Sequence, residues 1–214
     1  RAIGCVGVGL YEAVVPGMHG YRSLAGVVND LPEFPDAGRN VAYHWPSVAN
    51  AALAAMMRSL FSSAPPALQA QIDSLETSLA VAVPPGLASR STDRGRAVAQ
   101  AVDDWSRGDG GYGGHLRNFP TDYVPPSGPG LWEPTPPGNQ RAMQPYWGSN
   151  RPMGISSARS CDPGPPPAFS TDEGSDFFAE AFEVFETVNH LTGEQEAIAR
   201  FWADDPVRTA TPPG

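Results

Sequence analysis

Lysine is absent from this sequence of 214 residues, and all 14 of its basic residues are arginines. A lysine nucleophile, a Schiff-base lysine and the lysine of a phosphate-binding loop are therefore excluded within it. Charged residues make up only 17%, and acidic residues outnumber basic ones by 23 to 14, for a formal net charge of −9. An acidic surface argues against nucleic acid and anionic membranes as the main partners.

Cysteine and long apolar runs are scarce as well. The two cysteines, Cys5 and Cys161, stand far apart in the sequence and form no metal-binding spacing. We expect both to be unpaired, and a disulfide between them is the alternative. No apolar run approaches the roughly 18 residues that cross a bilayer, so we expect no membrane span.

None of the usual catalytic or metal-binding patterns is complete. His190 and Glu194 have the spacing of a helical metal pair, but Gly193 breaks the helix between them. The other histidines each stand alone: His19, His44 and His115. The adjacent carboxylates Asp103 and Asp104 do not face each other on a helix, so we expect a solvated helix end. We therefore expect no catalytic, cofactor-binding or metal-binding residue in this sequence.

Helical patterns run through both ends of the chain, and no strand pattern competes with them. We expect helices over residues 1–15, 48–61, 66–79, 92–105, 170–190 and 192–202. Ser47 is the expected cap of the second helix, and Pro84-Pro85 is the expected end of the third. In the fourth helix, Ala97, Ala101 and Trp105 are the expected buried face. The predicted fold class is all-α, a helical bundle.

The last two predicted helices begin with capping signals. Ser170 with Glu173, and Thr192 with Gln195, have the spacing of a capping box. The apolar residues of the first of these helices form one face: Phe177, Phe178, Ala181, Phe182, Phe185 and Val188. On the last helix Ile198, Phe201 and Trp202 are expected to face inward, and in a truncated domain we expect Phe201 and Trp202 to be left uncovered.

A long irregular segment, residues 108–169, separates the two groups of helices. It holds 24 of the chain's 47 glycines and prolines together with 7 of its 20 aromatic residues. Large rings supply apolar area that a free linker lacks. We expect an ordered loop that wraps the helices, with Trp132 and Trp147 largely buried, and a flexible linker is the alternative. Its glycine-rich start, 108–114, follows no strand and does not fit a phosphate-binding loop.

Four blocks of sequence carry a resemblance to a known family. They are Leu10-Tyr-Glu-Ala-Val-Val-Pro-Gly-Met18 with residues 20–26; Tyr43-His-Trp-Pro46 with residues 49–53; residues 128–137 with Pro145-Tyr-Trp-Gly148 and Asn150-Arg-Pro152; and Phe201-Trp-Ala-Asp204 with Thr211-Pro-Pro-Gly214. In order and spacing these blocks resemble bacterial vanadium-dependent haloperoxidase-like proteins of the type 2 phosphatidic acid phosphatase superfamily.

The resemblance implies an oxyanion site that this sequence does not contain. In the family, a Lys and an Arg, a Pro-Ser-Gly-His segment, and a later Arg and His hold vanadate or phosphate. These residues follow the Thr-Pro-Pro-Gly block. The resemblance therefore implies vanadate as cofactor of a longer protein, with none bound by this segment. It also implies that Asp204 or Asp205 pairs with an oxyanion-binding Arg; a plain helix-end carboxylate doublet is the alternative.

The expected organisation follows from the same resemblance. We expect N-terminal helices over 1–107, the wrapping loop over 108–169, and paired helices over 170–214 that lead into a C-terminal catalytic bundle, all as one structural unit. Both ends look cut, and we expect this N-terminal portion alone to be inactive. Its expected partners are that bundle or a second copy of the chain, in the periplasm or outside the cell. For the longer protein the resemblance implies either peroxide-dependent halide oxidation at bound vanadate or phosphomonoester hydrolysis at the same pocket. The alternative function is a non-enzymatic helical interaction module.

Overall fold

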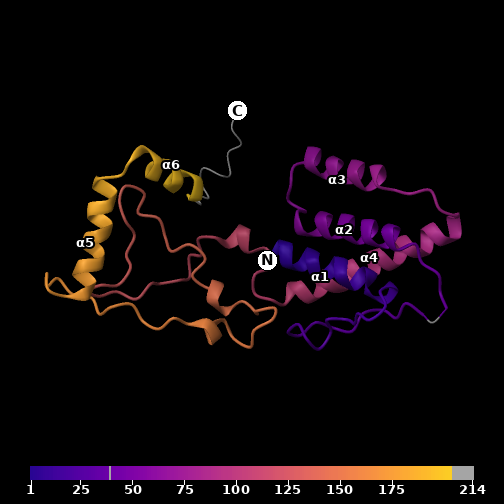
Figure 1. Ribbon diagram of the computed structural model, residues 1–214, viewed down its shortest axis with the longest axis horizontal. Coiled ribbons are helices and arrows are strands. Elements are labelled where there is room, and N and C mark those ends of the chain that lie inside the picture. The colour runs from indigo at the N-terminus through magenta and orange to yellow at the C-terminus, as the bar shows by residue number, and fades with distance from the viewer. Residues whose placement is uncertain (39, 204–214) are drawn as a thin grey trace. The chain divides into compact units, whose positions relative to one another are not determined.

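The computed structural model of the chain describes residues 1–38 and 40–203. Within these residues the structure is helical, with a single isolated bridge between Ala25 and Val28 and no strand, which confirms the predicted all-α class. The α-helices are α1 (Ala2–Val14), α2 (Trp45–Leu60), α3 (Pro66–Ser78), α4 (Pro85–Arg107), α5 (Asp176–Asn189) and α6 (Gly193–Trp202) (Figure 1). No helix of the described ranges has the length and apolarity to cross a membrane.

The chain divides into two compact units. The first comprises Arg1–Val124 and Pro134–Asp162, and the second comprises Pro125–Glu133 and the chain from Pro163 onward. The long irregular segment is therefore shared between the units. Its part in the first unit packs on the helices there: Arg151 Nη2 donates to the carbonyl of Trp105 in α4 at 2.7 Å, and Met153 packs against the buried core.

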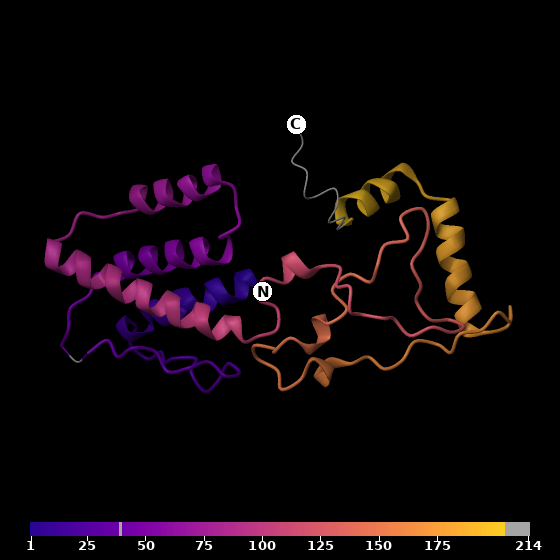
Figure 2. The same ribbon diagram turned by 180° about the vertical axis from the view of Figure 1, so that it is seen from behind.

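The core of the first unit lies where α1, α2 and α4 meet, and α3 lies along α2 (Figures 1 and 2). Two clusters of buried side chains fill it: Cys5, Val8, Leu31, Met56, Ala99, Val102 and Trp105 in one, and Ala13, Val48, Ala52 and Val98 in the other. Gly95 of α4 sits directly against the backbone of α2. A Cβ atom there would overlap the carbonyl oxygen of Val48 and come within 2.9 Å of the Ala52 nitrogen. Glycine thus permits the close approach of the two helices.

Helix α4 differs from its prediction in length and in rotational phase. It begins at Pro85, not at residue 92, because a proline fits the first turn of a helix. Helix α3 already ends at Ser78, so the expectation that Pro84-Pro85 ends it is wrong, and these prolines start α4 instead. Ala97 is exposed, whereas Val98 and Val102 are fully buried. The expected face through Ala97 and Ala101 is wrong, since the real face also contains small and polar residues: Ser91, Arg94, Gly95 and Ser106.

Three predicted helix starts have different outcomes. The N-cap of α2 is His44, so Ser47 lies inside the helix, where its hydroxyl is 2.8 Å from Nδ1 of His44. Helix α5 is capped by Ser175, not by Ser170, whose hydroxyl instead accepts a bond from the Asp172 amide in a local turn. The capping box of Thr192 with Gln195 at the start of α6 is confirmed.

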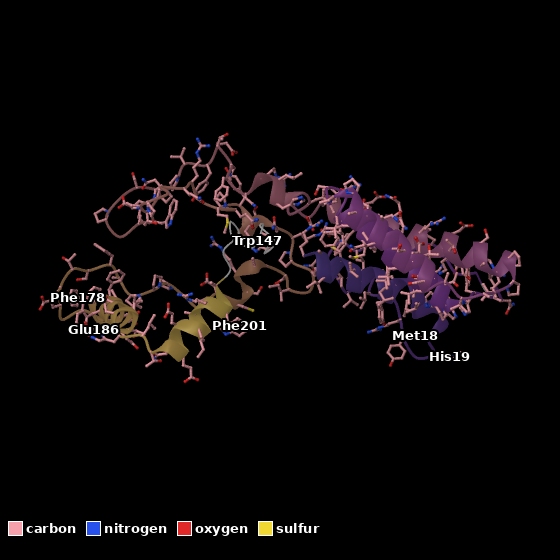
Figure 3. The ribbon with its side chains drawn as sticks, turned by 90° about the horizontal axis from the view of Figure 1, so that it is seen from above. Met18, His19, Trp147, Phe178, Glu186 and Phe201 are labelled. Carbon is pink, nitrogen blue, oxygen red and sulfur yellow. The ribbon has the colours of Figure 1, made fainter. Side chains whose placement is uncertain are left out.

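Several rings of the last two helices and of the irregular segment are exposed. No residue of α5 or α6 is buried, and Phe201 and Trp202 are 79% and 76% exposed. Figure 3 labels Phe178 and Glu186 on α5 and Phe201 on α6. Trp132 and Trp147 are 52% and 57% exposed, so the expectation that they are largely buried is wrong. Rings of the irregular segment make local pairs, such as Tyr123 with Tyr146 at 5.7 Å between centroids, which leave much of each ring uncovered.

Candidate functional site

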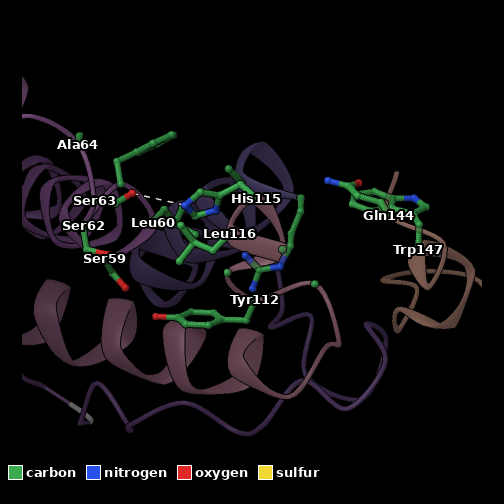
Figure 4. Close-up of a pocket in the computed structure, with 16 residues that line it drawn as sticks. Ser59, Leu60, Ser62, Ser63, Ala64, Tyr112, His115, Leu116, Gln144 and Trp147 are labelled. Carbon is green, nitrogen blue, oxygen red and sulfur yellow. Dashed lines mark hydrogen bonds between the residues drawn. The ribbon is translucent and has the colours of Figure 1, made fainter. Parts of the chain in front are cut away.

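The candidate site is a cavity of about 510 Å³ in the first unit (Figure 4). Its walls are the end of α2 with the residues that follow it, the glycine-rich stretch that follows α4, and Gln144 with Trp147 from the irregular segment. Gly110 and Gly113 have φ angles of +84° and +64°, which glycine adopts without strain. These turns bring Tyr112 and His115 to the cavity wall.

Tyr112 lies between two guanidinium groups that are themselves paired with carboxylates. The guanidinium carbons of Arg1 and Arg107 are 5.3 and 4.7 Å from its ring centroid. Arg1 Nε donates to Asp109 at 2.6 Å, and Arg107 Nη2 donates to Asp103 at 2.7 Å. Both guanidinium groups are thus paired with carboxylates, so neither is free to bind an anionic ligand in the cavity.

Asp103, the partner of Arg107 beside Tyr112, is a buried carboxylate and not a solvated one. It is 4% exposed and accepts hydrogen bonds from the hydroxyl of Ser59 and from Arg107. The bonds to Asp103 raise the pKa of Arg107 above its usual value. The expectation that Asp103 and Asp104 form a solvated helix end is therefore wrong for Asp103. It is confirmed for Asp104, whose side chain is 63% exposed. The two differ because adjacent positions on α4 point about 100° apart, and only Asp103 faces α2.

The structure brings His115 to Ser63, a pairing that the sequence did not reveal. The ring nitrogen Nε2 lies 3.4 Å from the Ser63 hydroxyl, across 52 residues of sequence. Both residues are exposed. In the described chain no carboxylate contacts the other ring nitrogen, so the group that would orient the imidazole as a base is missing. The pair can hold a polar ligand by hydrogen bonding but lacks the geometry of an activated nucleophile.

The described residues do not assemble a metal site or an oxyanion site of the family type. Residues 1–38 and 40–203 contain no group of three or more His, Cys, Asp or Glu that could hold a metal ion. His190 contacts Glu186, one turn earlier in α5, and not Glu194. In the cavity the Arg1 guanidinium is bound to Asp109, so the donor set does not fit vanadate. Asp204 and Asp205 lie outside the described residues.

Both cysteines are free, Cys5 within the core and Cys161 on the surface. This finding confirms the expectation that they do not pair. Burial raises the pKa of the Cys5 thiol, and the nearby Arg1 opposes part of that rise.

Comparison with known proteins shows a likeness to a solved structure. No protein-family model matches the chain, and no curated protein does. A solved structure described as the "first bacterial vanadium dependant iodoperoxidase" matches with a TM-score of 0.72 and 32% sequence identity, over 94% of this chain and 48% of that one. The chain thus spans about half the length of the structure it matches. Its helices therefore have a vanadium haloperoxidase-like fold over nearly their whole extent.

Proposed function

We propose that this chain is the N-terminal, non-catalytic helical portion of a vanadium-dependent haloperoxidase of the type 2 phosphatidic acid phosphatase superfamily. The likeness to the iodoperoxidase, which extends over almost all of this chain but only half of that protein, carries the proposal. The four ordered sequence blocks support it independently. Vanadate, when bound, supplies the centre at which peroxide oxidises a halide, and the residues that hold it belong to further polypeptide.

The proposed partner of this portion is the catalytic bundle of the same protein. Large exposed apolar side chains within each unit support such a partner, because contiguous apolar area on a protein surface commonly marks an interaction site. Ile3 of α1 is 89% exposed, and Phe201 and Trp202 end α6 in the same state. A second copy of the chain is the alternative partner. Asp204 or Asp205 would then hold an oxyanion-binding Arg in place through a charge-assisted bond.

The activity test compares two proteins, the full reading frame and the 214-residue chain. With orthovanadate, hydrogen peroxide and iodide, we expect triiodide formation by the full protein and a buffer-blank rate by the chain. Omitting vanadate is the matched control and should abolish the activity of the full protein. Iodide oxidation by the chain alone, above the blank, would contradict the proposal.

Two further outcomes separate this proposal from its rivals. Hydrolysis of a phosphomonoester by the full protein, without iodide oxidation, would indicate the phosphatase branch of the superfamily. A reading frame that lacks a Lys and Arg ahead of a Pro, and lacks Pro-Ser-Gly-His, would favour a non-enzymatic interaction module. A periplasmic or extracellular location belongs to the same proposal, and a leader peptide in the full reading frame would support it.

A further inference from the structure

Arg94 is a buried cation without a counter-charge. The residue is 7% exposed on α4, and its Nη1 donates to the carbonyl of Pro35 at 3.0 Å. Its Nε is buried and has no hydrogen-bond partner. Over the described ranges, no carboxylate lies within 4.0 Å of its guanidinium, although the chain has 23 acidic residues.

This state is unusual both in general and within this molecule. Burying a charge is costly unless the charge is paired and hydrogen-bonded. Arg1 is bound to Asp109, and Arg58 to Asp73. Arg151 also has a buried Nε without a partner, but Asp30 lies 3.5 Å from its guanidinium. Arg94 alone among these combines burial with the lack of a carboxylate within 4.0 Å. Glu12, Glu33 and Asp36 line one hollow together with Arg94, but none of them pairs with its guanidinium.

A second hollow, of about 520 Å³, provides the space for an anion. Arg94, Arg90 one helical turn earlier, and Tyr43 line it. The guanidinium carbons of Arg90 and Arg94 are 6.0 and 5.5 Å from the Tyr43 ring centroid, so both cations rest on one ring. Arg90 Nε donates to the carbonyl of Ala42 at 3.0 Å, and like Arg94 it has no carboxylate within 4.0 Å in the described chain.

Two acidic residues also line the hollow but are engaged elsewhere. Asp36 accepts from the amide of Gly38 at 3.0 Å, and Asp93 accepts from the hydroxyl of Ser89 at 3.3 Å. They lower the local positive potential without pairing with either arginine. The affinity for a free anion should therefore be modest.

We propose that this hollow binds a small oxyanion, a carboxylate or phosphate group, between Arg90 and Arg94. The planar guanidinium matches the two oxygens of such a group, and Arg94 has no carboxylate partner of its own within 4.0 Å in the described chain. No histidine or lysine lines the hollow, so the arrangement differs from the vanadate set that the resemblance implies. The anion is either a free solute or a carboxylate of further polypeptide, and this inference does not rest on the proposed function.

The experiment measures phosphate and acetate binding to the 214-residue chain by calorimetry, at constant ionic strength with chloride as the balancing anion. Arg94→Gln should weaken binding about tenfold or more, because it removes a charge-assisted contact. Arg90→Gln, at an exposed position, should weaken it by about threefold. Arg96→Gln is the matched control: it removes the same charge from the exposed side of α4 and should leave binding unchanged.

The outcomes either test the proposal itself or identify the source of the anion. Absence of phosphate and acetate binding, or equal weakening by Arg94→Gln and Arg96→Gln, overturns it. If Arg94→Gln fails to fold, the affinities of Arg90→Gln and Arg96→Gln for phosphate and acetate are compared instead. Equal weakening by these two variants then overturns the proposal. Given binding to the chain, phosphate binding to the full-length protein that Arg94→Gln weakens supports a free solute, because the family oxyanion site does not contain Arg94. Loss of this Arg94-dependent binding there supports a carboxylate of further polypeptide in the same place.

Discussion

The carboxylate of Glu12 accepts a hydrogen bond of 2.6 Å from the backbone amide of Leu24, and its other oxygen accepts one of 2.9 Å from the hydroxyl of Ser23. Glu12 is 1% exposed on α1. This buried acid therefore attaches residues 23 and 24, which follow α1, to the helix itself. Leu24 packs against the core beside it.

Substitution of Glu12 should cost stability out of proportion to its size. We expect Glu12→Gln to lower the free energy of unfolding by about 1–3 kcal/mol, because an amide replaces the charged acceptor of two hydrogen bonds. Glu33→Gln is the control at an exposed position and should change it by less than about 0.5 kcal/mol. Urea titrations of both variants measure the change. Equal losses of unfolding free energy in the two variants would show that the two hydrogen bonds of Glu12 do not stabilise the fold.

At Gly95 we expect alanine to destabilise the protein, although helix propensity alone would favour it. Alanine in a helix interior is ordinarily favoured over glycine by roughly 0.5–1 kcal/mol. At Gly95 the added methyl group meets the backbone of α2, so we expect Gly95→Ala to destabilise by about 1–3 kcal/mol. Gly86→Ala in the same helix has no atom within 4 Å of the new methyl group and should be neutral or stabilising. Thermal melts that rank the two alike would argue against the close approach of α2 and α4.

The two cysteines should react very differently. A chromogenic thiol reagent should modify exposed Cys161 rapidly in the native protein and buried Cys5 only after unfolding. Mass spectrometry of the alkylated chain identifies the site. Fast native labelling of Cys5 would mean that the core around it opens readily.

Stability should also fall at alkaline pH through Cys5. Burial raises the thiol pKa above its ordinary value near 9.0, so the folded state holds this proton more tightly than the unfolded chain. The resulting stabilisation is complete below that ordinary value and is lost as the pH rises through the raised pKa. Urea titrations at about pH 7 and pH 10 should show a smaller alkaline loss in Cys5→Ala than in the unsubstituted chain. An equal loss in both would remove Cys5 as the cause.

The exposed rings of the second unit predict dye binding. Phe182, Phe185 and Val188 of α5 are 50%, 59% and 62% exposed, and α6 adds Ile198 at 52%. We expect the chain to bind a hydrophobic dye or to self-associate despite its net charge of −9. Phe185→Ser should reduce the dye signal and change stability by less than about 0.5 kcal/mol. Leu79→Ser, exposed in the first unit, is the control for the dye signal, and a sharp monomer peak without dye binding would contradict the expectation.

Local chemistry was enough to predict most helices. The spacing of apolar residues located α1, α2, α3 and α6, and the capping box at Thr192 located the start of α6. Such features act within a few residues, so they can be read from neighbouring positions alone. The start of α5 was missed because two serines, Ser170 and Ser175, offer similar caps, and Ser170 is used in a turn instead.

The buried face of α4 needed the neighbouring helix to be known. Hydrophobic spacing favoured Ala97, whereas the structure buries Ser91 and Gly95. Ser91 is buried because its hydroxyl accepts the amide hydrogen bond of His44, and Gly95 because two backbones meet there. Neither reason is a property of α4 itself, so the spacing of its apolar residues predicted the wrong buried face.

The sequence by itself determined an all-helical, lysine-free chain whose family likeness lies in four ordered blocks. Only the tertiary structure decided that His115 meets Ser63, that Glu12 is buried, and that Arg94 rests on Tyr43 without a carboxylate. These relationships join positions from eleven to more than fifty residues apart. The first and third arise because packing α2 against α4 brings together the residues that flank these helices, and Glu12 is buried because the chain after α1 folds back onto that helix.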